Sequence, residues 1–311
     1  MTSMMKNSRL FGYLLGLHCG LIIAACGGTG SAPDTPAMIP VTPVAPITPV
    51  TPITPVIPVI PATPATPVIP AVPATPVTPA TPVIPVTPGP IPELRILVLG
   101  QSISSNCNDH VYPAIDNVFQ IGKDGAIKIA SDPFEWADCN NGSMWMPLGE
   151  KLISSAIAHK VIFMPIGVNG TKVSDWQADG VAFGKLNSAI GLIQAQGFKF
   201  DFAFWHQGSS DFGTGKDLYV QRLGEVIDYV NSRVKVSRWM IAIHSRCGTA
   251  YDRNIESAQL VFGNSPHLQR YPGPNTNLLG DEYRFDACHL NEKGQERMAS
   301  MWLDSMKAAL K

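Results

Sequence analysis

Apolar runs alternate with amphipathic stretches along the C-terminal part of this 311-residue chain. Short continuous runs of Val, Ile, Leu and Phe are typical of buried parallel strands, and they occur at 95–99, 160–166, 200–205 and 239–244. Apolar residues spaced by threes and fours predict helices at 148–158, 183–196, 218–234 and 295–310. Strands that alternate with helices predict an α/β fold, in which a mainly parallel sheet has helices on both faces.

Each predicted strand is followed by a short polar or glycine-containing segment. Ligands of open α/β sheets bind beyond the carboxyl ends of the strands, so we expect these segments to meet at one edge of the sheet. They are Gly100-Gln101-Ser102, residues 167–171, residues 206–211 and Ser245-Arg246-Cys247. A further polar segment, 286–291, comes just before the last predicted helix.

The first 25 residues have the pattern of a secretory signal peptide. Lys6 and Arg9 precede a mostly apolar stretch that ends in small residues, as before a signal-peptidase cut. Cys26 follows directly, which resembles the lipobox of bacterial lipoproteins, where such a cysteine is lipidated and begins the mature protein. Palmitate or similar chains on Cys26 would hold the protein on a membrane. An ordinary signal peptide with an incidental cysteine is the alternative; a transmembrane anchor would need a longer unbroken run.

Residues 26–92 form a linker in which Thr-Pro-Val, Ile-Pro-Val and Ala-Thr-Pro recur from about residue 36. Proline fixes φ and has no N–H, so this stretch can build neither helix nor sheet and is expected to be disordered polyproline II. About 57 such residues, at about 3.1 Å each, would reach on the order of 180 Å if fully extended. We expect the linker to hold the next domain away from a membrane; a ligand for proline-reading modules is the alternative.

Residues 93–311 are long enough for one α/β domain with a sizeable core. The formal net charge of the chain is −1. A nucleic-acid partner is therefore not expected, because binding of nucleic acid requires a basic stripe. The sequence does not indicate an oligomeric state.

Four cysteines lie in this domain. An even number of cysteines in an exported domain favours disulfides, and four allow three pairings. We expect Cys107 to pair with Cys139 and Cys247 with Cys288, because each pair lies on loops expected at the same end of the sheet. A zinc site is the alternative, but the chain lacks paired Cys-x-x-Cys spacing, so no metal is expected.

Ser102, Asp286 and His289 have the residue types of a serine hydrolase. Acyl transfer by serine needs a base for the hydroxyl proton and a group that orients this base. A carboxylate three residues before a histidine in a turn can accept the second imidazole N–H and fix the tautomer. Taken singly, each residue is equally typical of a turn, a cap or a solvated loop. Together, on strand-edge loops of one α/β pattern, they predict acyl transfer.

Four blocks of this domain resemble the motif blocks of the SGNH hydrolases, in the same order. They are Ser102 in Gly-Gln-Ser, Gly170 in Asn-Gly-Thr, the block from Trp205 to Asp211, and Asp286-x-x-His289. Gly-Gln-Ser and Trp-His-Gln-Gly are most similar to the sialate O-acetylesterase and acetylxylan esterase-like branch. The resemblance spans residues 96–310.

The resemblance implies a three-layer α/β/α, flavodoxin-like SGNH-hydrolase fold. It implies an esterase that removes acetyl or another small acyl group from a carbohydrate, without a cofactor. Ser102 would be the nucleophile, His289 the general base and then acid, and Asp286 the group that orients it. The oxyanion would be bound by the backbone N–H groups of Ser102 and Gly170 and by a third-block side chain, at Asp211. For Gly170, an ordinary turn glycine is the alternative.

Two departures from the branch pattern concern the oxyanion and the nucleophile turn. The third block has Ser209-Ser210-Asp211 where the branch usually has Glu-Ser-Asn or Glu-Ser-Asp. An ionised Asp211 would repel an oxyanion. It is therefore either protonated, which burial favours, or it points away and orders a donor such as His206 or Gln207. Ile103 replaces the usual asparagine after Gln-Ser, which removes one local hydrogen bond.

Other residues are weaker candidates. Substrate contacts are expected from Gln101, His206, Gln207 and Arg246, although a salt bridge across its loop suits Arg246 equally well. Three tryptophans could form a sugar-stacking wall, with a core role expected for at least two of them: Trp145, Trp176 and Trp205. The remaining histidines of the domain are expected to be structural or solvated: His110, His159, His244 and His267.

The sequence thus predicts an exported protein of the bacterial cell envelope, lipid-anchored on the outer membrane or cell surface, that acts on an acylated carbohydrate. The glycan preference rests on the family branch alone. Two alternatives remain open. One is a lipid or thioester hydrolase on the same fold, and the other is a glycan-binding surface protein in which the altered third block has abolished turnover.

Overall fold

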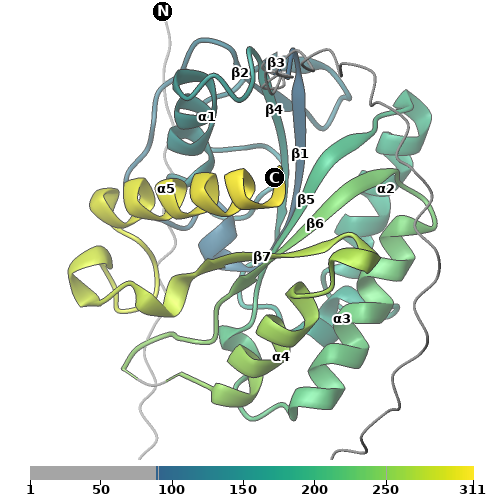
Figure 1. Ribbon diagram of the computed structural model, residues 1–311, viewed down its shortest axis with the longest axis vertical. Coiled ribbons are helices and arrows are strands. Elements are labelled where there is room, and N and C mark those ends of the chain that lie inside the picture. Colours follow the sequence, from purple (N-terminus) through teal and green to yellow (C-terminus); the bar gives the residue numbers. More distant parts are fainter. Residues whose placement is uncertain (1–88, 90, 250) are drawn as a thin grey trace, which may run out of the picture. The chain divides into compact units, whose positions relative to one another are not determined.

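The computed structural model describes residues 89, 91–249 and 251–311, so the predicted signal peptide, Cys26 and nearly all of the linker lie outside the described residues. At its centre is a seven-stranded sheet in the order β3-β2-β4-β1-β5-β6-β7 (Figure 1). All neighbouring strands are parallel except β2 and β3. The strands are β1 Leu94–Gly100, β2 Val118–Ile121, β3 Ile127–Ile129, β4 Val161–Gly167, β5 Phe200–His206, β6 Val236–Ile243 and β7 Arg270–Asn275.

Helices cover both faces of this sheet, which gives three layers. They are α1 Trp145–Ser154, α2 Phe183–Gln196, α3 Lys216–Asn231, α4 Arg253–Gly263 and α5 Glu292–Ala309. Figure 1 shows α1 and α5 on one face and α2, α3 and α4 on the other. The predicted α/β/α fold with a mainly parallel sheet is confirmed. Among the described residues, none of the helices combines the length and the apolar character that crossing a membrane requires.

Two hydrophobic cores lie on opposite faces of the sheet, and alternate residues of β1 supply both. Leu97 and Leu99 pack into the core under α2, α3 and α4, whereas Ile96 and Val98 pack into the core under α1 and α5. A strand with a core on each face buries side chains on both, which explains why β1 is apolar at successive positions from 96 to 99. Because β1, β4, β5 and β6 run parallel, the segments that follow them lie at the same, carboxyl edge of the sheet.

The four predicted strands and four predicted helices are all present, and α2 has the predicted bounds. Four elements are not among those predicted from the sequence: β2, β3, β7 and α4. Strand β7 contains two prolines, which are tolerated there because it lies at the edge of the sheet. Helix α4 does have a readable start signal, because the Asp252 side chain caps it by accepting hydrogen bonds from the N–H groups of Asn254 and Ile255.

Candidate active site

The nucleophile candidate begins a single 3-10 turn, Ser102–Ser104, immediately beyond β1. Gly100 ends the strand where only glycine fits, since a Cβ there would lie 2.2 Å from the carbonyl oxygen of His206. The hydroxyl groups of Ser104 and Ser105 donate to the Gln101 carbonyl oxygen at 2.8 and 3.1 Å, which holds the turn. Ser102 is 4% exposed. The turn therefore presents Ser102 at the sheet edge with only a small part of its surface in contact with solvent.

Gln101 connects this turn to the segment after β5. Its Oε1 accepts the N–H of Gly208 at 2.9 Å, and its Nε2 donates to the Ser209 hydroxyl at 2.7 Å. The Gln101 N–H also reaches the His206 carbonyl oxygen at 3.3 Å. Two of the strand-end segments thus meet as predicted, and Gln101, which is 2% exposed, positions them.

The base candidate lies on a tight hairpin in which Arg284 pairs with Leu290. Oδ2 of Asp286 lies 2.7 Å from Nδ1 of His289, and Oδ1 accepts the N–H groups of Cys288 and His289 at 3.0 and 2.6 Å. Partial burial acts to raise the pKa of Asp286, but the hydrogen bonds from the His289 ring and these N–H groups outweigh it and hold the pKa below its usual value. The carboxylate therefore stays ionised beside the imidazole.

The second ring nitrogen of His289, Nε2, is the one available for proton transfer. It is buried and has no hydrogen-bond partner within the described part of the chain. With Nδ1 held by Asp286, a neutral His289 carries its proton on Nδ1 and a lone pair on Nε2. This is the arrangement that a general base requires.

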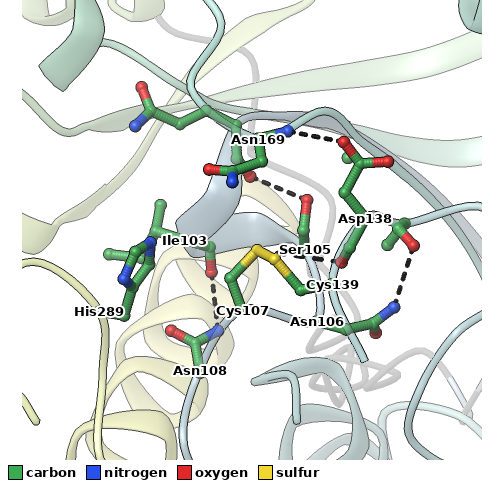
Figure 2. The surroundings of a disulfide bond; sticks show 12 residues. Ile103, Ser105, Asn106, Cys107, Asn108, Asp138, Cys139, Asn169 and His289 are labelled. Carbon is green, nitrogen blue, oxygen red and sulfur yellow. Dashed lines mark hydrogen bonds between the residues drawn. A yellow bond between two sulfur atoms is a disulfide. The ribbon is translucent and has the colours of Figure 1, made fainter. Parts of the chain in front are cut away.

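Asn108, which is not among the residues predicted from the sequence, joins the nucleophile turn to the base hairpin. Its Nδ2 donates to the Ile103 carbonyl oxygen at 3.0 Å (Figure 2), and its Oδ1 accepts the N–H of Leu290 at 3.0 Å. These two partners directly follow Ser102 and His289 in the chain. Asn108 therefore fixes the spacing of the two segments that carry the candidate nucleophile and base.

Gly170 lies in the loop after β4 with a φ of +71°. This left-handed conformation is disfavoured for residues with a side chain, so glycine suits the position. A Cβ on Gly170 would meet no atom within 4 Å, so it stands beside open space. The preceding N–H, of Asn169, donates to Oδ2 of Asp138 at 3.0 Å (Figure 2).

Asp211 is fully buried, and its carboxylate faces donors of the protein. Its Oδ2 accepts the Val173 N–H at 2.8 Å and the Gln207 Nε2 at 2.6 Å. Burial raises the pKa of Asp211 despite these hydrogen bonds. The same Gln207 nitrogen donates to the Thr171 carbonyl oxygen at 2.8 Å. Of the two alternatives for Asp211, this geometry matches the second, in which the carboxylate orders Gln207.

The four candidates for substrate contact all bond within the protein. Gln207 and His206 are fully buried, and burial, with a smaller effect of the charged Arg284, lowers the pKa of His206 to about 3. His206 pairs through Nε2 with the Thr276 hydroxyl at 2.8 Å. The Arg246 guanidinium forms a salt bridge with Asp281. Together with Gln101, these side chains shape the loops around the site.

The three tryptophans do not form a sugar-binding wall. Trp145, Trp176 and Trp205 are between 0 and 1% exposed. Trp145 belongs to the core on the α1 side, and the other two pack edge to face in the opposite core. All three therefore have the core role that was expected for at least two.

Two disulfides border the site, in the expected pairing of Cys107 with Cys139 and Cys247 with Cys288. The first ties the segment after the nucleophile turn to residues 134–142 (Figure 2), and the second ties the residue before His289 to the segment after β6. Among the described residues, no group of three or more His, Cys, Asp or Glu side chains could hold a metal ion.

The family model of the carbohydrate esterases named SASA, for sialic acid-specific acetylesterase, matches residues 100–308. The chain belongs to this family. It is therefore a carboxylic ester hydrolase of the carbohydrate esterase class. The matched region contains every candidate residue from Ser102 to His289.

Solved structures similar to this chain include one from Arabidopsis thaliana, with a TM-score of 0.50 and 14% identity over 70% of this chain and 98% of the other. A family 3 carbohydrate esterase from Clostridium thermocellum has a TM-score of 0.45 and 12% identity, over 70% and 97% of the two chains. A carbohydrate acetylesterase family member from Sinorhizobium meliloti has a TM-score of 0.41 and 14% identity, over 70% and 99%. At 14% identity, the likeness to the Arabidopsis structure shows a shared fold. No curated protein matches the chain.

Proposed function

We propose that the protein is a serine esterase that removes acetyl groups from a carbohydrate through an acyl-enzyme on Ser102. The observation that carries this proposal is the Asp286–His289 pair, whose 2.7 Å contact leaves Nε2 buried and unpartnered among the described residues. Asn108 holds this pair and the nucleophile turn in one framework. Family membership supplies the carbohydrate ester as substrate class.

In the first half of the reaction, the Ser102 hydroxyl oxygen attacks the ester carbonyl carbon while Nε2 of His289 takes its proton. The carbonyl oxygen becomes an oxyanion that accepts hydrogen bonds from the backbone N–H groups of Ser102 and Gly170. Each such donor contributes about 3 kcal/mol to stabilising the transition state. The imidazolium then gives its proton to the sugar oxygen, the ester bond breaks, and the sugar leaves.

In the second half, water attacks the acyl-enzyme. His289 takes a proton from this water and returns it to the Ser102 oxygen, which releases acetate. Asp286 remains ionised throughout and stabilises the imidazolium. Asp211 acts as a positioning residue rather than as an oxyanion donor, because its Oδ2 accepts from both Val173 and Gln207, which border the Gly170 loop.

Acetyl is the proposed acyl group because the matched family is that of the sialic acid-specific acetylesterases. The test is acetate release by the full chain from O-acetylated sialic acid, xylo-oligosaccharides and other acetylated glycans, with Ser102→Ala as control. Acetate release from at least one glycan, absent in the variant, is expected. A marked preference for octanoyl over acetyl esters would contradict the proposal. Equal rates of acetate release by the unmodified chain and by Ser102→Ala would contradict it as well.

We also propose that Cys26 is lipidated and anchors the protein to a membrane of the bacterial envelope, with residues 26–92 as spacer. The position of Cys26 after a signal-like segment supports this. Palmitate labelling in an expressing bacterium should be lost in Cys26→Ala and kept in Cys19→Ala. Labelling that persists in Cys26→Ala would refute the anchor.

A further inference from the structure

An aromatic ring stands directly against the proposed catalytic base. Phe285 lies opposite His289 in the hairpin, where its N–H donates to the His289 carbonyl oxygen at 3.1 Å. The phenyl and imidazole rings stack, with centroids 6.0 Å apart and an angle of 29° between their planes. The backbone pairing of the hairpin thus places one apolar face beside the base.

Packing within the protein does not account for this ring. Phe285 is 45% exposed and belongs to neither hydrophobic core. Single exposed apolar side chains are common on protein surfaces; what sets Phe285 apart is that its ring stacks on the imidazole of the proposed base. The Phe285 ring therefore has a solvent-exposed surface next to the His289 imidazole.

The chemistry of the reaction determines which part of the substrate passes this face. His289 donates its proton to the leaving oxygen, so the alcohol part of the ester must come within hydrogen-bond distance of Nε2. The carbonyl oxygen instead lies towards the N–H groups of Ser102 and Gly170. In a carbohydrate ester the alcohol is the sugar itself, and a sugar ring has an apolar C–H face that packs on aromatic rings.

We propose that Phe285 is a substrate-binding residue that forms a platform for the sugar ring from which the acyl group is removed. The inference rests on the proposed function, because it uses His289 as the proton donor to the leaving sugar. It assigns sugar recognition to the base hairpin and not to the buried tryptophans. Specificity for carbohydrate esters over esters of small alcohols then depends on this one side chain.

The test compares Phe285→Ala with the unmodified full chain on two acetate esters, an O-acetylated pyranoside and ethyl acetate. Loss of one stacking contact should lower kcat/KM for the pyranoside about 3- to 10-fold, mainly through KM. Ethyl acetate has no ring to stack, so its kcat/KM should change less than about twofold. Phe285→Tyr keeps the aromatic face and should restore pyranoside hydrolysis.

Leu260→Ala is the matched control, because it removes an exposed apolar side chain from α4. This variant should leave kcat/KM unchanged for both the acetylated pyranoside and ethyl acetate. Equal losses on both esters in Phe285→Ala would overturn the inference, since they would show that Phe285 acts only through His289. An unchanged pyranoside rate would overturn it as well. Ser102→Ala separates the two proposals: if that variant still hydrolyses ethyl acetate at the full rate, the proposed function itself fails.

Discussion

At the scale of single residues, the two oxygens of Asp286 have separate roles. Oδ1 accepts two backbone N–H groups and shapes the turn, while Oδ2 holds the His289 ring. Ala287, which follows Asp286 in this turn, has a φ of +65°, a left-handed conformation that is unusual for a residue with a side chain. The hydrogen bonds of Asp286 hold this turn in place. The carboxylate therefore sets both the backbone and the tautomer of the base.

Asp286→Asn should lower kcat by about 10⁴-fold, as in other serine triads, because an amide can leave His289 in the wrong tautomer. KM should change little, since Asp286 does not contact substrate. Hydrolysis of p-nitrophenyl acetate measures both constants. Asp281→Asn, which removes a carboxylate from the same region, should keep nearly full activity. Similar losses in the two variants would argue against Asp286 as the orienting group.

Asp211 offers a choice between two chemical roles that substitution can separate. The Val173 N–H and the Gln207 amide both bond to the same oxygen, Oδ2, so Asp211→Ala removes the acceptor of both. The free energy of unfolding should fall by about 1–3 kcal/mol, because buried donors lose their acceptor. kcat should fall as well, since the Gly170 loop loses its support. If Asp211 instead donated a proton to the oxyanion, Asp211→Ala would lower kcat and leave the free energy of unfolding nearly unchanged.

Sequence reasoning predicts Ser102, Asp286 and His289 as candidates because their chemistry is carried by residue type and short spacing. The positioning roles of Gln101 and Asn108 depend on contacts between loops far apart in the chain. No local pattern contains that information. Contacts between distant loops also explain why the four residues expected to contact substrate instead form hydrogen bonds or salt bridges within the protein: Gln101, His206, Gln207 and Arg246.

At the scale of elements, the segment 134–142 braces the loops after β1 and β4 (Figure 2). The Asp138 carbonyl oxygen accepts the Asn106 N–H at 3.0 Å, and its carboxylate accepts the Asn169 N–H at 3.0 Å. Lys185 pairs with the same carboxylate at 2.7 Å. Partial burial acts to raise the pKa of Asp138, but these two contacts outweigh it and hold the pKa below its usual value. Asp138 thus links the nucleophile turn to the Gly170 loop.

Asp138→Ala should lower kcat about tenfold while KM changes less, because a misplaced oxyanion donor acts on the transition state. Lys185→Met is the matched control. It removes the partly exposed ion pair, which contributes about 0–1 kcal/mol, and the hydrogen bond from Lys185 Nζ to the Gly167 carbonyl oxygen, but it leaves the Asn169 contact in place. Lys185→Met should therefore retain most of kcat. Equal effects of the two substitutions would assign the role to the ion pair instead.

Elements with strong periodicity were predictable, and elements defined by their surroundings were not. Strand β1 is buried on both faces and reads as a continuous apolar run, and α2 has its apolar residues on one stripe. Strand β7 has the sequence Arg-Tyr-Pro-Gly-Pro-Asn, which suits a loop, and it becomes a strand only because β6 is available for pairing. Its tertiary context overrides its local preference.

At the scale of the whole molecule, burial of polar groups makes stability depend on pH. Asp132 is 7% exposed, and one of its oxygens has no hydrogen-bond partner among the described residues. Burial raises the pKa of Asp132 to about 6, despite N–H donors from Ser143 and Tyr112 and a nearby His110. The ordinary value is 3.8. The folded state therefore favours the protonated acid more than the unfolded state does.

The free energy of unfolding should accordingly rise as pH falls through about 6 towards 4, with Asp132 contributing at most about 3 kcal/mol. Urea unfolding at pH 7 and pH 5 measures this difference. Asp132→Asn cannot ionise and should flatten the dependence. At still lower pH the sign reverses, because Asp138 and Asp286 have lowered pKa values and their contribution is lost on protonation. An unchanged slope in Asp132→Asn would contradict the assignment.

The central claim is that Ser102 is the nucleophile activated by His289. The most direct measurement is covalent labelling with diethyl p-nitrophenyl phosphate, which phosphorylates activated serines, followed by mass spectrometry of the intact protein and of its peptides. We predict one adduct per chain, located on Ser102, formed in step with the loss of esterase activity and absent in His289→Ala. An adduct on another residue, or full esterase activity with Ser102 quantitatively modified, would contradict the account.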